Sequence, residues 1–446
     1  MRNDPGRRGV SEIKTKESID NLYRIFLQHP VITTDSRSVP PQSIFFALKG
    51  SNFDGNLFAD KALELGAACV VIEDPACRKD DRYLLVGNVL TALQELALYH
   101  RMKLEIPILG ITGSNGKTTT KELIHAVLSK RYRTIATSGN LNNHIGVPLT
   151  LLSITTDTEI AAIEMGANHP GEIDFLCHLA RPTHGLITNI GRAHLEGFGN
   201  FEGVVQTKTE LYRFLKEVNG WVFINADDPL LMEHAEGLKR KTYGFSQGAN
   251  LTGYQLPGQE TLDLDITFPN HRTDSVHTRF FGSYNALNVM AAACIGNHFQ
   301  VPAQTIVSAI EDYAPANNRS QVHRTQRNLL ILDAYNANPD SMPAALKDFD
   351  AAFSANKMVI LGDMLELGPE TDREHQRILE LLGELDMSKV FLVGPVFGRL
   401  NNNPVWRSFE TSREAKEWFA NHPVENAAIL LKGSRGIRLE EIVESL

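Results

Sequence analysis

The stretch Gly110–Glu122, which reads GITGSNGKTTTKE, contains the residue types that hold the phosphates of a nucleotide. Gly113 and Gly116 permit a tight turn whose backbone N–H groups could converge on phosphate oxygens. Lys117 could reach the β and γ phosphates, and the hydroxyl of Thr118 could bind Mg²⁺. This combination favours a nucleotide site over an ordinary glycine-rich turn.

The surroundings of this loop support that prediction. The apolar segment 106–112 is expected to be a buried strand, and the segment 117–130 a helix whose positive N-terminal end favours anions. Ile111 occupies the position at which the usual phosphate loop has its first glycine. The loop is therefore interpreted as a variant of that pattern.

Two further residues follow predicted strands of the same sheet. Glu164 lies near the end of the segment 159–166, and His194 follows the segment 184–190 on a glycine-flanked loop. Ligands of open α/β sheets bind at the carboxyl ends of the strands, so both side chains could lie beside the phosphate loop. Glu164 could bind Mg²⁺ directly or through water. The alternatives are a solvated glutamate and a surface or packed histidine.

The remaining polar candidates are less specific. Asn285 and Asn288 are three residues apart at the start of a predicted helix, where Asn285 could be a cap and Asn288 could hydrogen-bond a base. Lys208 lies on another predicted helix, and its local sequence indicates only a solvated lysine.

Three groups of predicted elements position these residues. A small α/β unit comes first, with strands at 43–50 and 68–74 around a helix at 58–67. Strands alternate with helical stretches in the next group, which predicts a parallel sheet with strands at 106–112, 159–166, 184–190 and 221–225. Within 251–281, apolar and polar residues alternate with a period of two, which predicts antiparallel strands at one edge of this sheet. A polar boundary at 314–321 precedes a doubly wound sheet with strands at 329–335, 357–363, 389–395 and 427–433. We predict an α/β protein with a small N-terminal domain at 1–104, a central P-loop ATPase domain at 105–315 and a C-terminal Rossmann-like domain at 316–446.

The composition is that of a soluble globular protein, with 446 residues, 42% hydrophobic residues and a formal charge of −9. This charge argues against a nucleic-acid partner. The four cysteines form no C-x-x-C pair, which argues against a thiolate zinc site and favours a reducing compartment. Neither a signal peptide nor a membrane-spanning run is recognised, so we expect a cytoplasmic protein.

Several motifs together resemble the Mur ligase family, whose members form amide bonds with ATP during assembly of the bacterial cell wall. The resemblance covers nearly the whole chain and rests on GSNGKTTTKE (113–122), EMGANHPGEI (164–173), TNIGRAHLEGFG (188–199), DAYNANPDSMPAAL (333–346) and LGDMLELG (361–368). With TSGNLNNHIGVPLTLL (137–152), they resemble the branch that joins D-alanyl-D-alanine to UDP-N-acetylmuramoyl-tripeptide. Two departures are Asn56 and Tyr284, which stand where the family often has histidine.

The resemblance implies roles for individual residues. The residues expected to bind ATP are Gly113, Ser114, Asn115, Gly116, Lys117, Thr118, Thr119, Asn288, Arg319, Asp333 and Asn338. The catalytic set is Lys117, Glu164, His194 and Lys208, and the metal set is Thr118, Glu164, His194 and Lys208, the last as a carbamate. The residues expected to bind the two other substrates are Ser36, Arg37, Asn140, Asn142, Asn143, Lys432 and Arg435.

The implied chemistry is activation of a carboxylate by the γ-phosphoryl group of ATP, followed by attack of an amine on the acyl phosphate. The implied cofactors are ATP, two Mg²⁺ ions and a carbamylated lysine. The implied partners are small-molecule substrates, with no nucleic acid and no membrane insertion, and we expect a monomer. A ligase that adds a single amino acid, a folate-modifying ligase, a P-loop ATPase switch and a non-catalytic scaffold are the alternatives.

Overall fold

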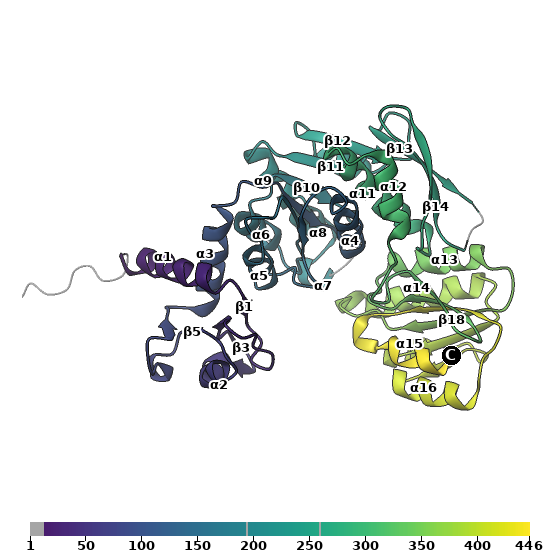
Figure 1. Ribbon diagram of the computed structural model, residues 1–446. Coiled ribbons are helices and arrows are strands. Elements are labelled where there is room, and N and C mark those ends of the chain that lie inside the picture. Colours follow the sequence, from purple (N-terminus) through teal and green to yellow (C-terminus); the bar gives the residue numbers. More distant parts are fainter. Residues whose placement is uncertain (1–12, 193–194, 258–259) are drawn as a thin grey trace, which may run out of the picture.

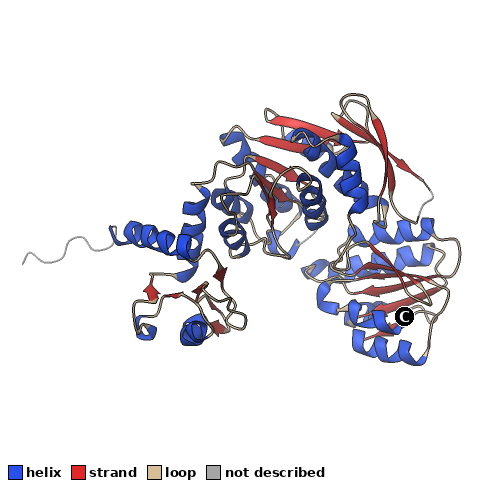
Figure 2. Ribbon diagram, viewed as in Figure 1, coloured by secondary structure: helices blue, strands red, loops and turns tan. Residues whose placement is uncertain are grey.

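The phosphate loop requires a strand before it and a helix after it, and the computed structural model places that junction in the middle one of three sheets. The structure describes residues 13–192, 195–257 and 260–446. The sheets contain four, nine and six strands, in addition to a two-stranded hairpin. Figures 1 and 2 show three successive units, with the nine-stranded sheet between the other two. The predicted three-domain α/β fold is confirmed.

The N-terminal unit is a parallel sheet in the order β1-β2-β5-β6. The predicted strand 43–50 is split, because the chain turns into a hairpin after Phe46 and then returns so closely that a Cβ on Gly55 would lie 2.5 Å from the carbonyl carbon of Ala47. Helix α3 packs against α5 (Gly146–Leu152) and α6 (Glu172–Ala180) of the central unit. The elements are α1 (Ile13–Gln28), β1 (Ile32–Thr33), β2 (Ile44–Phe46), β3 (Lys49–Gly50), β4 (Phe53–Asp54), α2 (Ala59–Glu64), β5 (Cys69–Ile72), β6 (Tyr83–Leu85) and α3 (Val89–Arg101).

The central sheet has the order β15-β14-β13-β12-β11-β10-β7-β9-β8. Strands β13, β14 and β15 pair antiparallel, as the alternation in 251–281 predicts, and the other pairs are parallel. Apolar residues of α4, α11 and α12 join the core on one face, and those of α5, α6, α8 and α9 join the core on the other. The strands are β7 (Ile108–Thr112), β8 (Thr134–Ala136), β9 (Ile160–Glu164), β10 (His184–Ile187), β11 (Trp221–Asn225), β12 (Lys239–Gly244), β13 (Leu251–Leu256), β14 (Asp263–Thr267) and β15 (Thr273–His277). The helices are α4 (Lys117–Leu128), α5 (Gly146–Leu152), α6 (Glu172–Ala180), α7 (Leu195–Phe198), α8 (Phe201–Lys208), α9 (Glu210–Glu217), α10 (Pro229–His234), α11 (Ala286–His298) and α12 (Ala303–Asp312).

The C-terminal sheet has the order β16-β17-β21-β18-β19-β20, and only β16 pairs antiparallel among these strands. Helices α13 and α14 contribute to the core on one face and α16 to the core on the other, which confirms the doubly wound arrangement. The elements are β16 (Gln321–Arg324), β17 (Leu329–Asp333), α13 (Ser341–Ala352), β18 (Lys357–Gly362), α14 (Thr371–Glu384), β19 (Lys389–Val393), α15 (Pro395–Leu400), β20 (Arg407–Phe409), α16 (Ser412–Asn421) and β21 (Ala428–Lys432).

Two global features bear on the sequence-based expectations. Across the described ranges, no helix has the length and apolar character needed to cross a bilayer. All four cysteines are free thiols.

Candidate active site

The phosphate loop connects β7 to α4, and its glycines are required by geometry. Gly113 and Gly116 have φ angles of 142° and 78°, in the region that favours glycine. A Cβ on Gly116 would lie 2.5 Å from the Oδ1 atom of Asn288. Ile111, in contrast, lies fully buried within β7 before the turn begins, so no glycine is needed there.

The segment that follows β10 holds the phosphate loop in place through hydrogen bonds. The amide of Asn115 donates to the Oδ1 atom of Asn189 at 2.9 Å, and the hydroxyl of Thr188 donates to the carbonyl of Asn115 at 2.6 Å. The hydroxyl of Ser114 donates to the carbonyl of Gly191 at 3.0 Å. These bonds fix the loop, while the first N–H groups of α4 have no acceptor within the helix and can bind phosphate.

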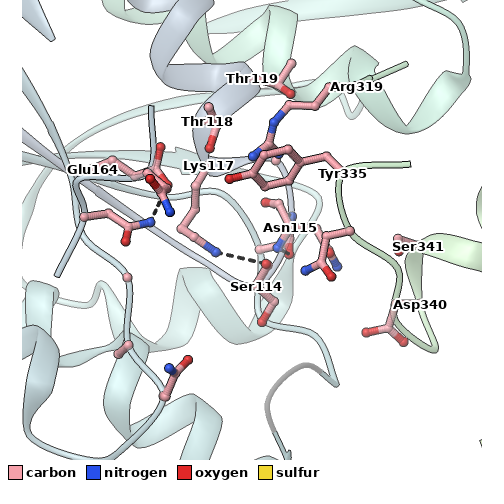
Figure 3. Close-up of a pocket in the computed structure, with 18 of the residues that line it drawn as sticks. Ser114, Asn115, Lys117, Thr118, Thr119, Glu164, Arg319, Tyr335, Asp340 and Ser341 are labelled. Atoms are coloured by element: carbon pink, nitrogen blue, oxygen red, sulfur yellow. Dashed lines mark hydrogen bonds between the residues drawn. The ribbon is translucent and has the colours of Figure 1, made fainter. Parts of the chain in front are cut away.

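Lys117 lies in the fold of this loop (Figure 3). Its Nζ atom donates to the carbonyls of Gly113 and Ser114 at 2.7 and 3.1 Å. Burial lowers the pKa of Lys117 below its ordinary value, which the charge of Glu164 opposes and that of Arg319 reinforces. The ammonium group is therefore directed toward the site and is held there by the loop itself.

Glu164 ends β9 beside the loop, where the sequence predicts it, and its side chain is only 1% exposed. Its Oε1 atom accepts a 2.8 Å bond from the amide of Asn142, whereas its Oε2 atom is buried without a hydrogen-bond partner. Thr118 also lines the site. An unpartnered carboxylate oxygen and a hydroxyl are oxygen donors of the kind that Mg²⁺ prefers.

A cavity of about 1010 Å³ joins the loop to the C-terminal unit. It brings together most of the predicted residues, namely Ser114, Asn115, Gly116, Lys117, Thr118, Thr119, Asn140, Asn142, Asn143, Glu164, Asn288, Arg319, Asp333, Lys432 and Arg435. Glu366 of the motif LGDMLELG lines the same cavity. His194 lies outside the described residues. Among the described residues, no group of three or more His, Cys, Asp or Glu side chains is arranged to hold a metal ion.

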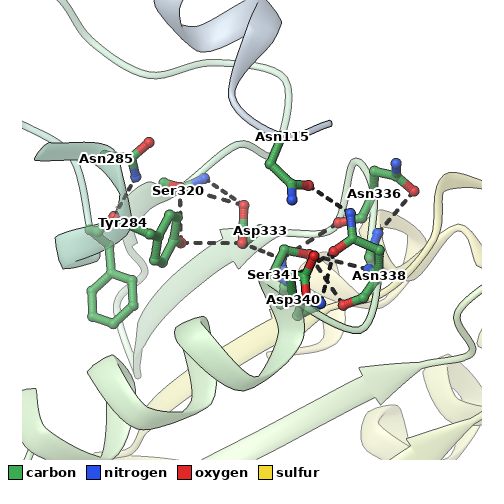
Figure 4. A network of polar contacts seen from close by, with 12 residues as sticks. Asn115, Tyr284, Asn285, Ser320, Asp333, Asn336, Asn338, Asp340 and Ser341 are labelled. Carbon is green, nitrogen blue, oxygen red and sulfur yellow. Dashed lines mark hydrogen bonds and ion pairs between the residues drawn. The ribbon is translucent and has the colours of Figure 1, made fainter. Parts of the chain in front are cut away.

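Polar contacts connect the two walls of this cavity (Figure 4). The Nδ2 atom of Asn338 donates to the Oδ1 atom of Asn115 at 2.6 Å, so the phosphate loop contacts the C-terminal unit directly. The carboxylate of Asp333 forms an ion pair with Lys432 at 2.5 Å and accepts a 3.2 Å bond from the hydroxyl of Tyr284. Tyr284, which departs from the family pattern, thus bridges the central and C-terminal units.

Tyr335 is a residue of the site that the sequence analysis did not single out. The guanidinium carbon of Arg319 lies 3.5 Å from the centroid of the Tyr335 ring, and that of Arg435 lies 5.3 Å from it. Arg435 also donates to the hydroxyl of Tyr335 at 3.5 Å. The signal for this residue is its place in DAYNANPDS, two residues after Asp333 at a strand end.

The asparagines have more local roles than the sequence indicates. Asn143 caps α5, because its Oδ1 atom accepts bonds from the amides of Ile145 and Gly146. Asn285 occupies the position before α11, but its side chain makes no capping bond and donates instead to the carbonyl of Phe281. The capping prediction is therefore wrong for Asn285. The side chain of Asn288 accepts a 3.0 Å bond from Thr120.

Lys208 does not line the cavity. Its side chain is buried, which overturns the alternative of a solvated lysine, and its Nζ atom lies 5.3 Å from the ring centroid of Phe198. Burial lowers the pKa of Lys208 to about 7, and Lys117 acts in the same direction.

The predicted UDP-sugar contacts lie in the N-terminal unit, away from the lining of the cavity. Ser36 is buried, whereas Arg37 is exposed and pairs with Asp35 at 2.9 Å. The Oδ1 atom of Asn56 accepts a 3.0 Å bond from the amide of Glu73, so this side chain stabilises the end of β5.

Comparisons with known proteins agree with this geometry. The family models described as Mur ligase family, catalytic domain, as Mur ligase middle domain and as Mur ligase, glutamate ligase domain match residues 30–101, 111–296 and 318–435. The chain is 37% identical over 431 residues to UDP-N-acetylmuramoyl-tripeptide--D-alanyl-D-alanine ligase of Bacillus subtilis, covering 93% of this chain and 92% of the relative. It is 33% identical over 435 residues to the enzyme of that name from Escherichia coli, covering 93% of each.

Two solved structures resemble the whole chain. MurF from Acinetobacter baumannii has a TM-score of 0.83 and 31% identity, covering 93% of this chain and 92% of that chain. MurF from Thermotoga maritima in complex with ADP has a TM-score of 0.82 and 27% identity, covering 94% and 97%. With three family models along its length and relatives above 30% identity over nine-tenths of it, the chain belongs to the Mur ligase family.

Proposed function

We propose that this protein joins D-alanyl-D-alanine to UDP-N-acetylmuramoyl-tripeptide while ATP is converted to ADP and phosphate. The observation that carries the proposal is the cavity shared by the phosphate loop and the C-terminal unit. A ligase that activates one substrate with ATP and receives the second from another domain needs such a shared space. The relatives named for this reaction match more than nine-tenths of the chain.

The first task of the site is to bring the γ-phosphate of ATP against a substrate carboxylate. Both groups are anions, so most of the catalytic effect must be electrostatic. The amides at the start of α4 and the ammonium of Lys117 would hold the phosphates, and Arg319, which lines the same cavity, would add a second positive charge. Phosphoryl transfer then gives an acyl phosphate, whose phosphate leaves when the dipeptide amine attacks the carbonyl carbon.

The donor set of the site fits Mg²⁺. Glu164, through its unpartnered Oε2 atom, and Thr118, through its hydroxyl, would hold the ion. When bound, Mg²⁺ offsets the negative charge of the β and γ phosphates. A second ion at His194 stays a prediction, since that residue lies outside the described part of the chain.

We also propose that Lys208 is carbamylated. A pKa of about 7 leaves a substantial neutral fraction near neutral pH, and the neutral amine is the form that reacts with CO₂. The nitrogen of the neutral amine forms a bond to the carbon of CO₂ and releases one proton, so a buried neutral group becomes an anion. Such an anion would attract the ammonium of Lys117, whose positive charge acts on Lys208.

The C-terminal wall suits the dipeptide. Asp333 neutralises Lys432 through a buried ion pair, which leaves Arg435 to receive the carboxylate of D-alanyl-D-alanine. Ser36 and Arg37 would contact the UDP-sugar. The boundaries after residues 104 and 315, the monomeric state and a cytoplasmic location complete the proposal.

Phosphate release by the full-length protein tests this function. ATP and UDP-N-acetylmuramoyl-tripeptide should give sustained release with D-alanyl-D-alanine and background release with single amino acids. Preference for a single amino acid would assign the protein to another ligase of the family. Equal release without either peptide substrate would indicate an ATPase switch and refute the proposal.

A further inference from the structure

We propose that Lys121, Thr137 and Asn142 form a support that positions the carboxylate of Glu164 in the nucleotide site. The inference rests on the proposed ATP- and Mg²⁺-dependent function and assigns positioning roles to residues outside the phosphate-binding set. Lys121 and Thr137 are buried polar residues that the mechanism above does not use. Asn142 is reassigned from substrate binding to this support.

Thr137 hydrogen-bonds to β9 just beyond the last paired residue of β8, the edge strand of the central sheet. Strand β8 pairs with β9 only as far as Ala136, opposite Ala162. The amide of Thr137 still donates to the carbonyl of Ala162 at 3.0 Å, but the amide of Glu164 donates at 2.9 Å to the hydroxyl of Thr137. A side-chain oxygen therefore receives the bond that fixes the backbone of Glu164 as the neighbouring strand turns away.

Lys121 fixes Thr137 from the other side. It lies one turn after Lys117 on α4, and its side chain is fully buried. Its Nζ atom donates to the carbonyl of Thr137 at 2.5 Å and pairs with Glu122 at 2.6 Å. Since a buried ammonium group is unfavourable unless it is well bonded, this arrangement strongly restrains the backbone of Thr137.

Asn142 sets the orientation of the carboxylate. Its amide donates to the Oε1 atom of Glu164 at 2.8 Å, and its carbonyl accepts from the amide of Gly166 at 2.8 Å. A Cβ on Gly166 would lie 3.0 Å from the side chain of Asn142, so the amide is packed closely against this glycine. One oxygen of Glu164 is thus occupied, and the other is presented to a cation.

The test measures ADP affinity by isothermal titration calorimetry, in EDTA and across a range of Mg²⁺ concentrations. Thr137→Val keeps the shape of the side chain and removes the hydroxyl, whereas Thr137→Ser keeps the hydroxyl. Groups that orient metal ligands typically change metal affinity by about 10- to 100-fold. We expect Thr137→Val, Asn142→Ala and Lys121→Met to require at least about tenfold more Mg²⁺ for the same gain in ADP affinity, with little change in EDTA. Thr137→Ser should follow the wild type.

A purely structural role would give a different pattern. The proposal would be overturned if the variants lost ADP affinity equally with and without Mg²⁺, or if Thr137→Val kept the Mg²⁺ dependence of the wild type. It would also be overturned if the ADP affinity of the wild type did not depend on Mg²⁺. If Thr137→Val does not fold, Asn142→Ala provides the same test, because Asn142 is only partly buried. No peptide substrate is present, so the result is independent of the ligase assay.

Discussion

Replacing Tyr335 by leucine should weaken nucleotide binding more than dipeptide binding. The ring of Tyr335 supports Arg319 at 3.5 Å, within the cavity, and Arg435 at 5.3 Å. A cation–π contact contributes about 0.5–1 kcal/mol when exposed and about 2 kcal/mol when desolvated. The closer and more enclosed contact with Arg319 should therefore dominate.

These energies convert directly into measurable ratios. A loss of about 1–2 kcal/mol at Arg319 corresponds to roughly 5- to 30-fold weaker ADP binding. A loss of about 0.5–1 kcal/mol at Arg435 corresponds to roughly a two- to fivefold higher KM for the dipeptide. Calorimetry with ADP and phosphate-release kinetics measure the two effects separately.

Tyr335→Phe is the matched control, because it keeps the ring and loses only the 3.5 Å bond from Arg435 to the hydroxyl. We expect this variant to bind ADP within about twofold of the wild type. If Tyr335→Leu also binds ADP within that margin, or if Tyr335→Phe loses as much ADP affinity as Tyr335→Leu, the ring does not position Arg319.

Four further experiments test other parts of the proposed mechanism. Gly116→Ala should weaken ADP binding more than about tenfold, because its Cβ would collide with Asn288, whereas Gly248→Ala, also at positive φ but in open space, should leave ADP binding at the wild-type level. The free energy of unfolding, measured with urea, should rise between about pH 7 and pH 10.5, because in this range the unfolded chain binds a proton at Lys208 that the folded chain has released. Lys208→Met should reduce the slope of the unfolding free energy against pH. An equal slope in both proteins would contradict the lowered pKa. Lys208→Ala should lose ligase activity and regain part of it with a small carboxylate, so full activity without additive would contradict the carbamate. Small-angle scattering should show compaction with an ATP analogue plus the UDP-substrate, and an unchanged radius of gyration would contradict domain closure.

The apolar strands were predictable because each buried parallel strand is a short hydrophobic run between turn signals. Strands β16 and β20 were missed, since they lie at the two edges of their sheet and are short and polar. The variant loop was recognised in the sequence, but only the structure shows that Ile111 precedes the turn and needs no positive φ.

Long-range contacts were beyond the reach of the sequence. The pairing of Asn115 with Asn338 joins residues far apart in the chain, and neither local pattern indicates it. Likewise, the hydrogen bond from Lys121 to the carbonyl of Thr137 depends on where β8 ends, and the local sequence does not indicate this contact. The domain boundaries and the roles assigned to individual site residues stay predictions.

The resting place of Lys117 has a consequence for turnover. Because its ammonium already donates to the carbonyls of Gly113 and Ser114, a nucleotide gains this lysine by exchanging bonds and not by forming entirely new ones. An exchange yields a smaller net free energy than the new contact alone. After the terminal phosphate departs, the lysine can return to the same two carbonyls, which eases release of the spent nucleotide and lets the next cycle begin.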